Sequence, residues 1–262
     1  MPKVEIVVEP GSAESLGEVS GNLGLGKSCL IVEDAITREV AGARIGASLE
    51  KEGFQVVEVI VDKPDEANVG RALTQAPSDG FLIGVGGTSV LDVTKLAAYR
   101  KNARYVLFST GMANSGIISK TSSIYVDGKK ESLPVGLADA VVVDLTVVAA
   151  APRWMVAAGC GDLVIEATAI KDWQLGRYEV EEPYCESIAQ LEMSTLDQIL
   201  RMSDEIRSRT EKGIECLVDA LIVSGLGMAM WGSSRPSSGS EHLWSHCLDH
   251  HAEESKTPPG RH

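Results

Sequence analysis

The first 145 residues alternate short β-branched, apolar runs with stretches of helix-forming residues. Six runs predict strands, at 4–10, 28–34, 54–61, 80–87, 104–110 and 140–145. Helix formers fill the intervals at 13–23, 38–52, 66–75 and 88–99. Strands separated by helices of this length form βαβ units, so the alternation predicts a parallel sheet with helices on both faces. The strand runs are nearly continuously apolar, as expected for strands buried on two sides.

The pattern changes near residue 150. Just before this point, TSSIYVDGKKESLPVGL predicts a β-hairpin with an Asp-Gly turn. Beyond it the strand signal nearly vanishes, and apolar residues recur every three or four positions. This spacing predicts helices at about 153–174, 185–209, 211–230 and 240–251. We therefore expect an α/β protein, with a Rossmann-like parallel-sheet domain over 1–150 and an all-helical domain over 151–262. The cleft between two such domains is the expected place for a site.

Charge and cysteine content exclude several classes of protein. The chain has 262 residues and a formal net charge of −13, with no basic stripe. Nucleic-acid phosphates need clustered Lys and Arg, so we expect no nucleic-acid partner. The N-terminus lacks an apolar signal core, and no uninterrupted run approaches the ~18 apolar residues of a membrane span. Five scattered cysteines without a CxxC pattern are typical of reduced thiols, so we expect a cytoplasmic protein.

A glycine turn is the most informative feature of the first half. In GFLIGVGGTSV, Gly84, Gly86 and Gly87 follow a buried strand, and Thr88 and Ser89 open a helix. Glycines let the backbone turn sharply and approach a ligand, and the N–H groups of a helix start attract phosphate. A tight strand-to-helix turn with Thr88 as the N-cap is the alternative interpretation.

Two acids end the strand SCLIVED. An acid at the carboxyl end of such a strand can bind the ribose 2′-hydroxyl of NAD and repel the 2′-phosphate of NADP. Glu33 and Asp34 occupy this position, and Asp34 is the candidate. A solvated loop acid is the alternative.

All five histidines lie in the last 21 residues. Three of them, His242, His246 and His250, are spaced by four and share one face of an expected helix. Imidazoles on one face suit a metal centre, although a buried helix-face histidine explains His242 equally well. For His250 and His251 we favour solvated side chains beside Glu253 and Glu254.

Several stretches resemble a known family. They are GVGGTSVLDVTKLAA, FSTGMANSGIISKTSSIY, VVVDL, APRWMVAAGCGDLVIEATAIKDW and RPSSGSEHLWSH. Together they resemble the iron- or zinc-dependent polyol dehydrogenases related to dehydroquinate synthase, over essentially the whole chain. The last two are similar to the glycerol-1-phosphate branch of that family.

The resemblance implies that the first domain binds NAD or NADP. The glycine turn would then hold the dinucleotide pyrophosphate, which implicates Gly86, Gly87, Thr88, Ser89 and Val90. The loop after the next strand would lie along the nicotinamide, which adds Thr110, Gly111, Met112, Ala113 and, further on, Ser119.

The resemblance also implies a Zn²⁺ ion and a small-molecule substrate in the helical domain. Asp162 of the AGxGD motif would be a metal ligand that borders the substrate, or else a helix acid favoured by the helix dipole. His242 would be the second ligand and His262 the third, while His246 would contact substrate. Asp162 and His246 are therefore the expected catalytic residues.

One loop departs from the family pattern. Relatives read SHDGIASP with an acid that touches substrate hydroxyls, whereas this chain reads ANSGIISK. Ser115 stands at the acid's position, as a candidate substrate-binding residue, and Lys120 replaces proline. Relatives also continue for several more helices, so we expect the chain to be truncated at its C-terminus.

We therefore expect an NAD(P)-dependent oxidoreductase, in which a metal polarises a substrate oxygen while hydride passes to or from the nicotinamide. The resemblance points to dihydroxyacetone phosphate and sn-glycerol 1-phosphate, the backbone of archaeal-type lipids, and to a homo-oligomer. Two alternatives remain open: an unphosphorylated polyol such as glycerol as substrate, and nucleotide binding without turnover.

Overall fold

The computed structural model describes residues 4–250, and the chain separates into two compact units. The first unit comprises residues 1–112 and 116–153, and the second comprises residues 113–115 and 154–262. Ser115 thus belongs to the helical second unit, although the segments before residue 113 and after residue 115 belong to the first.

The first unit is built on a six-stranded sheet in which all neighbouring strands are parallel. Its order is β1-β8-β5-β4-β2-β3, from β1 (Glu5–Glu9), β2 (Ser28–Glu33), β3 (Gln55–Ile60), β4 (Phe81–Gly86), β5 (Arg104–Ser109) and β8 (Ala140–Asp144). The predicted parallel sheet is confirmed. The chain runs outward from β2 to one edge and from β4 to the other. The direction therefore reverses between β2 and β4, the position where open α/β sheets bind ligands.

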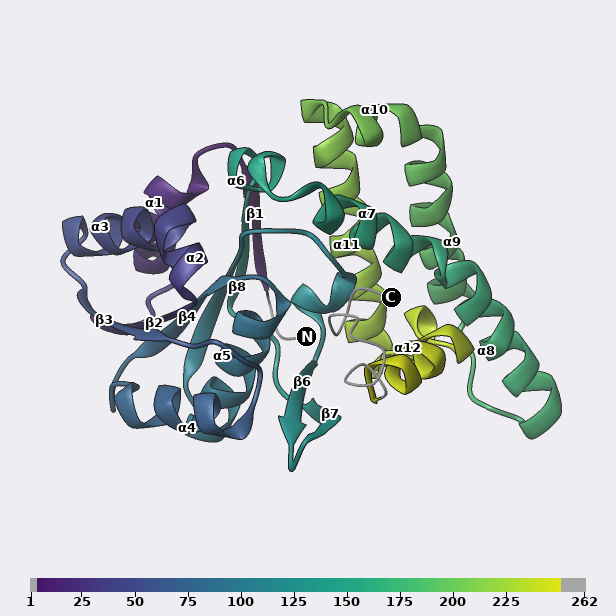
Figure 1. Ribbon diagram of the computed structural model, residues 1–262, viewed down its shortest axis with the longest axis horizontal. Coiled ribbons are helices and arrows are strands. Elements are labelled where there is room, and N and C mark those ends of the chain that lie inside the picture. The colour runs from purple at the N-terminus through teal and green to yellow at the C-terminus, as the bar shows by residue number, and fades with distance from the viewer. Residues whose placement is uncertain (1–3, 251–262) are drawn as a thin grey trace. The chain divides into compact units, whose positions relative to one another are not determined.

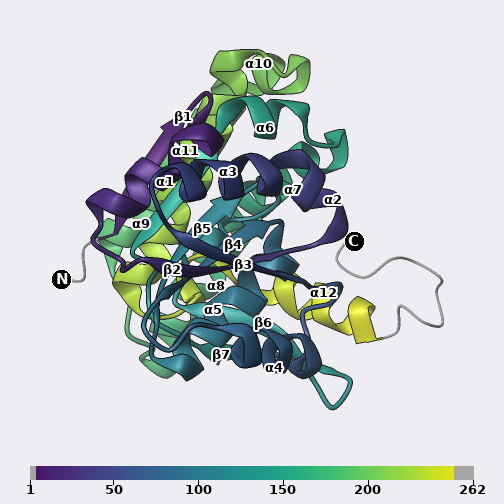
Figure 2. The ribbon, with the colours of Figure 1, turned by 90° about the vertical axis from the view of Figure 1, so that its left-hand side faces the viewer.

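Helices cover both faces of this sheet, with α1 and α3 over one face and α4 and α5 over the other (Figures 1 and 2). The helices of this unit are α1 (Ser12–Asn22), α2 (Ala35–Thr37), a π-helix (Arg38–Gly42), α3 (Ala43–Lys51), α4 (Glu66–Gln75), α5 (Thr88–Lys101) and α6 (Leu145–Ala150). All six residues of β4 are buried, which explains its uninterrupted apolar sequence. α6 was not predicted, and residues 38–42, predicted as the start of a helix over 38–52, form a π-helix.

The predicted hairpin is also confirmed. Strands β6 (Thr121–Val126) and β7 (Lys129–Pro134) pair antiparallel after the short 3₁₀ helix at Ser115–Ile118. Asp127 and Gly128 both have positive φ, 49° and 77°, as a type I′ turn requires.

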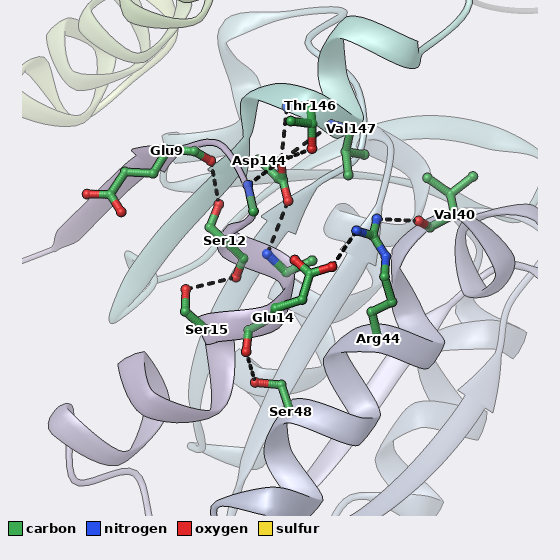
Figure 3. Close-up of polar contacts among 12 residues, drawn as sticks. Glu9, Ser12, Glu14, Ser15, Val40, Arg44, Ser48, Asp144, Thr146 and Val147 are labelled. Carbon is green, nitrogen blue, oxygen red and sulfur yellow. Dashed lines mark hydrogen bonds and ion pairs between the residues drawn. The ribbon is translucent and has the colours of Figure 1, made fainter.

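Asp144 fastens two helix starts to the end of β8 (Figure 3). Its carboxylate accepts hydrogen bonds from the N–H groups of Gly11 and Ala13 at 3.1 and 3.2 Å, and from the N–H of Thr146 at 2.9 Å. These donors begin α1 and α6, whose first N–H groups have no partner within their helix. Despite its burial, the hydrogen bonds lower the pKa of Asp144, so it stays ionised.

The second unit is helical. It contains α7 (Arg153–Val164), α8 (Glu166–Val180), α9 (Glu186–Arg201), α10 (Ser203–Ser208), α11 (Glu211–Trp231), a 3₁₀ helix (Arg235–Ser237) and α12 (Ser240–His250). The helix predicted over 153–174 is interrupted at Ile165, and the one predicted over 185–209 is interrupted at Met202. Apolar periodicity continues through both interruptions, so it could not locate them.

Trp173 anchors the packing of α8 in this unit. It is fully buried, donates its indole N–H to the Pro183 carbonyl at 2.8 Å, and meets Tyr184 and Trp231 edge-on at 4.6 and 4.8 Å. α11 has the length and apolarity of a membrane span, but 72% of its most apolar window is buried inside the protein. It is therefore packed as a core helix is, and its hydropathy is weak evidence for a span.

Candidate functional site

The glycine turn lies at the sheet edge where ligands are expected. Glu33 pairs with Val85, and Gly86 pairs with Ser109, so β2, β4 and β5 end side by side. The residues that follow these strands are Asp34, Gly87 and Thr110. The register thus brings three predicted cofactor-binding segments to one edge of the first unit.

Gly86 and Gly87 have different surroundings. A Cβ atom at Gly86 would lie 2.7 Å from the Cβ of Val90, so glycine is needed there for packing. A Cβ atom at Gly87 would meet no atom within 4 Å. Gly87 is the N-cap residue of α5, and a glycine has no side chain to cap the helix. The alternative in which Thr88 is the N-cap is wrong, because Thr88 is already the first residue of α5. Open space at an uncapped helix start suits a bound anion.

The loop after β5 is tied to this turn. The Thr110 N–H donates to the Gly86 carbonyl at 3.1 Å, and the Ser109 hydroxyl donates to the Gly111 carbonyl at 2.9 Å. Met112 is buried, whereas Ser89 is exposed, Val90 is buried, and Ala113 is half-buried in the second unit.

A buried lysine holds Ser119 and the residues around it. The Lys95 ammonium donates to the carbonyl oxygens of Gly116 and Thr121 at 2.5 and 3.3 Å, and it lies 3.5 Å from the Ser119 hydroxyl. Ser119 itself donates to the Gly116 carbonyl at 2.9 Å. This lysine was not predicted as a functional residue. The loop near the expected nicotinamide position is thereby fixed to α5, the helix that the glycine turn opens.

Asp34 and Glu33 take different roles. The Asp34 carboxylate Oδ1 accepts hydrogen bonds from the N–H groups of Ile36 and Thr37, both at 2.8 Å, and so caps α2. Oδ2 accepts no hydrogen bond from a described residue, so it is available to a ligand. Glu33 is fully buried and faces away from solvent, which excludes it as a solvated loop acid.

In the second unit, Asp162 on α7 is held by Ser115. Both the backbone N–H and the hydroxyl of Ser115 donate to Asp162 Oδ2, each at 2.8 Å. Burial raises the pKa of Asp162 above its ordinary value, and these two hydrogen bonds and the charge of His242 offset only part of that rise. Asp162 and His242, the first two expected metal ligands, are thus close enough for the charge of one to affect the pKa of the other.

His242 lies in the first turn of α12, which is anchored from α8. Asp172 accepts a hydrogen bond from the Ser240 N–H at 2.7 Å, and so caps this helix. The His242 ring nitrogen Nδ1 lies 3.2 Å from Glu241 Oε1, and its side chain is about one-third exposed. The start of α12 is therefore held by a side chain of α8.

Nothing is described of the other four histidine side chains. His246 and His250 lie in α12 with side chains that are not described, and His251 and His262 fall beyond residue 250. Among the described residues, no three His, Cys, Asp or Glu side chains form a complete metal site. Asp162 and His242 nevertheless supply a carboxylate and an imidazole, the donor types that Zn²⁺ and Fe²⁺ take, and fit two positions of such a site.

Two buried glutamates in the second unit were missed. Glu166 and Glu192 are fully buried, and the Thr195 hydroxyl donates to Glu166 at 2.8 Å. Burial, together with the charge of Glu192, raises the pKa of Glu166 to about 9, and burial raises the pKa of Glu192 to about 7. Both acids occupy inward positions of otherwise amphipathic helices, and an acid at an apolar position was the available signal.

Comparison with known proteins identifies the family. Residues 7–152 match the family described as iron-containing alcohol dehydrogenase. The chain belongs to this family. Glycerol-1-phosphate dehydrogenase [NAD(P)+] from Methanothrix thermoacetophila is 36% identical over 258 residues, which are 98% of this chain and 71% of that relative. The Thermococcus sibiricus protein of the same name is 35% identical over 94% of this chain and 70% of its own.

Solved structures of other proteins share the fold of this chain. Glycerol dehydrogenase from Schizosaccharomyces pombe superposes with a TM-score of 0.74 at 19% identity, over 93% of this chain and 64% of that one. A probable glycerol dehydrogenase from Sinorhizobium meliloti 1021 gives 0.78 at 22% identity, over 93% of this chain and 69% of that one. The predicted α/β fold with a helical second half is thus confirmed.

Proposed function

We propose that this chain is an NAD(P)-dependent oxidoreductase that interconverts dihydroxyacetone phosphate and sn-glycerol 1-phosphate, and so supplies the backbone of archaeal-type glycerophospholipids. The observation that carries the proposal is the 36% identity, over 98% of the chain, to a glycerol-1-phosphate dehydrogenase [NAD(P)+]. Identity this extended covers both the sheet unit and the helical unit.

The first unit supports the cofactor part of the proposal. Gly86, Gly87 and the first turn of α5 form an uncapped helix start at the point where the strand order reverses. The pyrophosphate of a dinucleotide would accept hydrogen bonds from the backbone N–H groups there. Thr110 through Met112 follow the neighbouring strand and would lie beside the rest of the cofactor, with Ser119 held by Lys95.

The second unit supports the metal and substrate part. Asp162 and His242 would hold a divalent cation, with His262 as the third ligand. A bound zinc ion supplies Lewis-acid polarisation of the substrate carbonyl. Ser115 orients Asp162, Asp172 fixes the helix that carries His242, and His246 would contact the substrate from the same helix.

An assay with paired substrates tests this function. We expect the purified chain, supplied with Zn²⁺, to oxidise NADH or NADPH with dihydroxyacetone phosphate at a kcat/KM at least about tenfold above that with dihydroxyacetone. Dialysis against a chelator should abolish the rate, and Zn²⁺ should restore it. Equal rates with the two ketones would instead favour a glycerol or polyol dehydrogenase, which the absence of an acid at Ser115 suggests. Cofactor binding without oxidation of NADH or NADPH by either ketone would favour a nucleotide-binding protein without turnover.

We further propose a cytoplasmic, self-associating enzyme. All five cysteines are unpaired, as reduced thiols are in a cytosol. The family resemblance carries the proposal of a homo-oligomer, and light scattering on the purified chain tests it.

A further inference from the structure

The strongest unexplained contact in the second unit joins Ser115 to Asp162. The two residues are 47 positions apart, yet the Ser115 N–H and hydroxyl both lie 2.8 Å from the same carboxylate oxygen, Oδ2. Ser115 is 3% exposed and opens the 3₁₀ helix Ser115–Ile118. The contact therefore joins a buried serine to a half-buried aspartate.

The two hydrogen bonds fix one edge of the carboxylate. Both donors converge on Oδ2, and Oδ1 accepts no hydrogen bond from a described residue. Two donors from one residue, a backbone N–H and a hydroxyl, hold this oxygen in place. Oδ1 thus remains for another partner, as in a carboxylate that binds a metal ion through one oxygen.

The same contact limits what Ser115 can do for a substrate. A serine hydroxyl has one proton, and this one is donated to Asp162. Its remaining capacity is that of an acceptor. The carbonyl and phosphate oxygens of dihydroxyacetone phosphate are also acceptors, so Ser115 cannot donate to them while it holds Asp162. Its oxygen can still accept a hydrogen bond from a substrate hydroxyl.

We propose that Ser115 is a positioning residue whose N–H and hydroxyl hold Asp162 as a one-oxygen ligand of the divalent cation. The inference rests on the metal site of the proposed function. It assigns to Ser115 a role in cation affinity, which is measurable without turnover.

Cation affinity of three variants tests this role. The chain is freed of metal by chelation, and the Kd for Zn²⁺ is measured by competition with a chromophoric chelator. We expect S115A to bind Zn²⁺ about tenfold more weakly than the parent chain, as is usual when an outer hydrogen bond to a ligand is lost. S115T keeps the hydroxyl donor and should bind within about twofold of the parent. S194A removes an exposed hydroxyl, bonded only to the Leu191 carbonyl in the same unit, and should leave the Kd unchanged.

The possible results separate the inference from the proposed function. If S115A has the same Kd for Zn²⁺ as the parent and a raised KM for dihydroxyacetone phosphate, Ser115 contributes to substrate binding and not to cation affinity. A parent chain that binds no Zn²⁺ would refute both the inference and the metal part of the proposed function. A tenfold loss in S115A, in a chain without turnover, would support the inference and refute the proposed function alone.

Hydrogen exchange keeps the inference testable if S115A does not fold. The Ser115 amide opens a short helix and has Asp162 as its acceptor, so it should exchange slowly in the parent chain. In D162A, the same amide should exchange at least about tenfold faster. Equal exchange rates in the two proteins would contradict the contact.

Discussion

Glu33 and Gly42 are packed so closely that a Cβ atom at position 42 would overlap the Glu33 carboxylate. Glu33 ends β2, is fully buried, and has no hydrogen-bond partner for either carboxylate oxygen among the described residues. Its nearest cation is Arg38, 3.7 Å away at the start of the π-helix that ends at Gly42. The extra residue of the π-helix turn thus accommodates a buried acid, at the sheet edge that also carries the glycine turn.

The first prediction is that Gly42→Ala destabilises the protein. Forcing a methyl group against a buried carboxylate costs about 1–3 kcal/mol in free energy of unfolding, measured by urea denaturation. Gly21→Ala is the matched control, because a Cβ atom there meets no atom within 4 Å in α1, and alanine should stabilise that helix by about 0.5 kcal/mol. Shortening the acid in Glu33→Ala/Gly42→Ala should recover about 1 kcal/mol or more as coupling. Strict additivity of the two changes would contradict the contact.

The second prediction concerns pH. Burial raises the pKa of Glu33 from 4.5 to about 7; the charges of Glu58, Asp34 and Glu39 raise it too, and Arg38 opposes them. Between these values the folded chain binds more protons than the unfolded chain, so Glu33 makes stability fall as pH rises through this window.

Glu33→Gln removes that contribution. Its free energy of unfolding should resemble the parent's near pH 5 and exceed it by up to about 3 kcal/mol near pH 8. The difference between the two proteins isolates Glu33 from the other acids. A difference that stays constant from pH 5 to pH 8 would show that Glu33 is ionised throughout.

The third prediction separates cofactor binding from folding at the glycine turn. Because a side chain at Gly87 meets open space, Gly87→Val should keep the parent's melting temperature and lose at least about tenfold in NADH affinity, measured by fluorescence titration. Gly86→Ala should lower the melting temperature, because its methyl group meets Val90. Unchanged NADH affinity in Gly87→Val would show that the turn binds no pyrophosphate.

Local patterns were sufficient to predict most of the first unit. The apolar run of β4, the two glycines after it and the Asp-Gly turn of the hairpin each specify a conformation within a few residues, and the structure has all three. The interruptions at Ile165 and Met202 were missed, because the residues on both sides continue the same apolar periodicity.

Contacts between distant residues were not predictable in the same way. Glu33 was considered with Asp34 as a ribose-binding acid or a solvated loop acid, whereas it is buried against a π-helix that no local pattern indicates. The candidate function of Ser115 followed from its position in a loop motif, whereas its partner, Asp162, lies in another helix. A sequence names the donors and acceptors, but only the folded chain decides which of them meet.

The fourth prediction concerns the choice between NAD and NADP. Asp34 follows β2, caps α2 through Oδ1 and keeps Oδ2 available, so its charge should favour a ribose hydroxyl over a 2′-phosphate. Serine is also a good N-cap residue, so Asp34→Ser should keep the helix and remove only the charge. We expect the ratio of kcat/KM for NADPH to that for NADH to rise about tenfold, since one like-charge contact at a partly exposed site is worth roughly 1 kcal/mol or more. Asp65→Ser, which changes the N-cap of α4 in the same way at the start of another helix, should leave the ratio unchanged. If the ratio does not move in Asp34→Ser while the melting temperature falls, Asp34 serves the helix alone, and the cofactor preference must come from another residue.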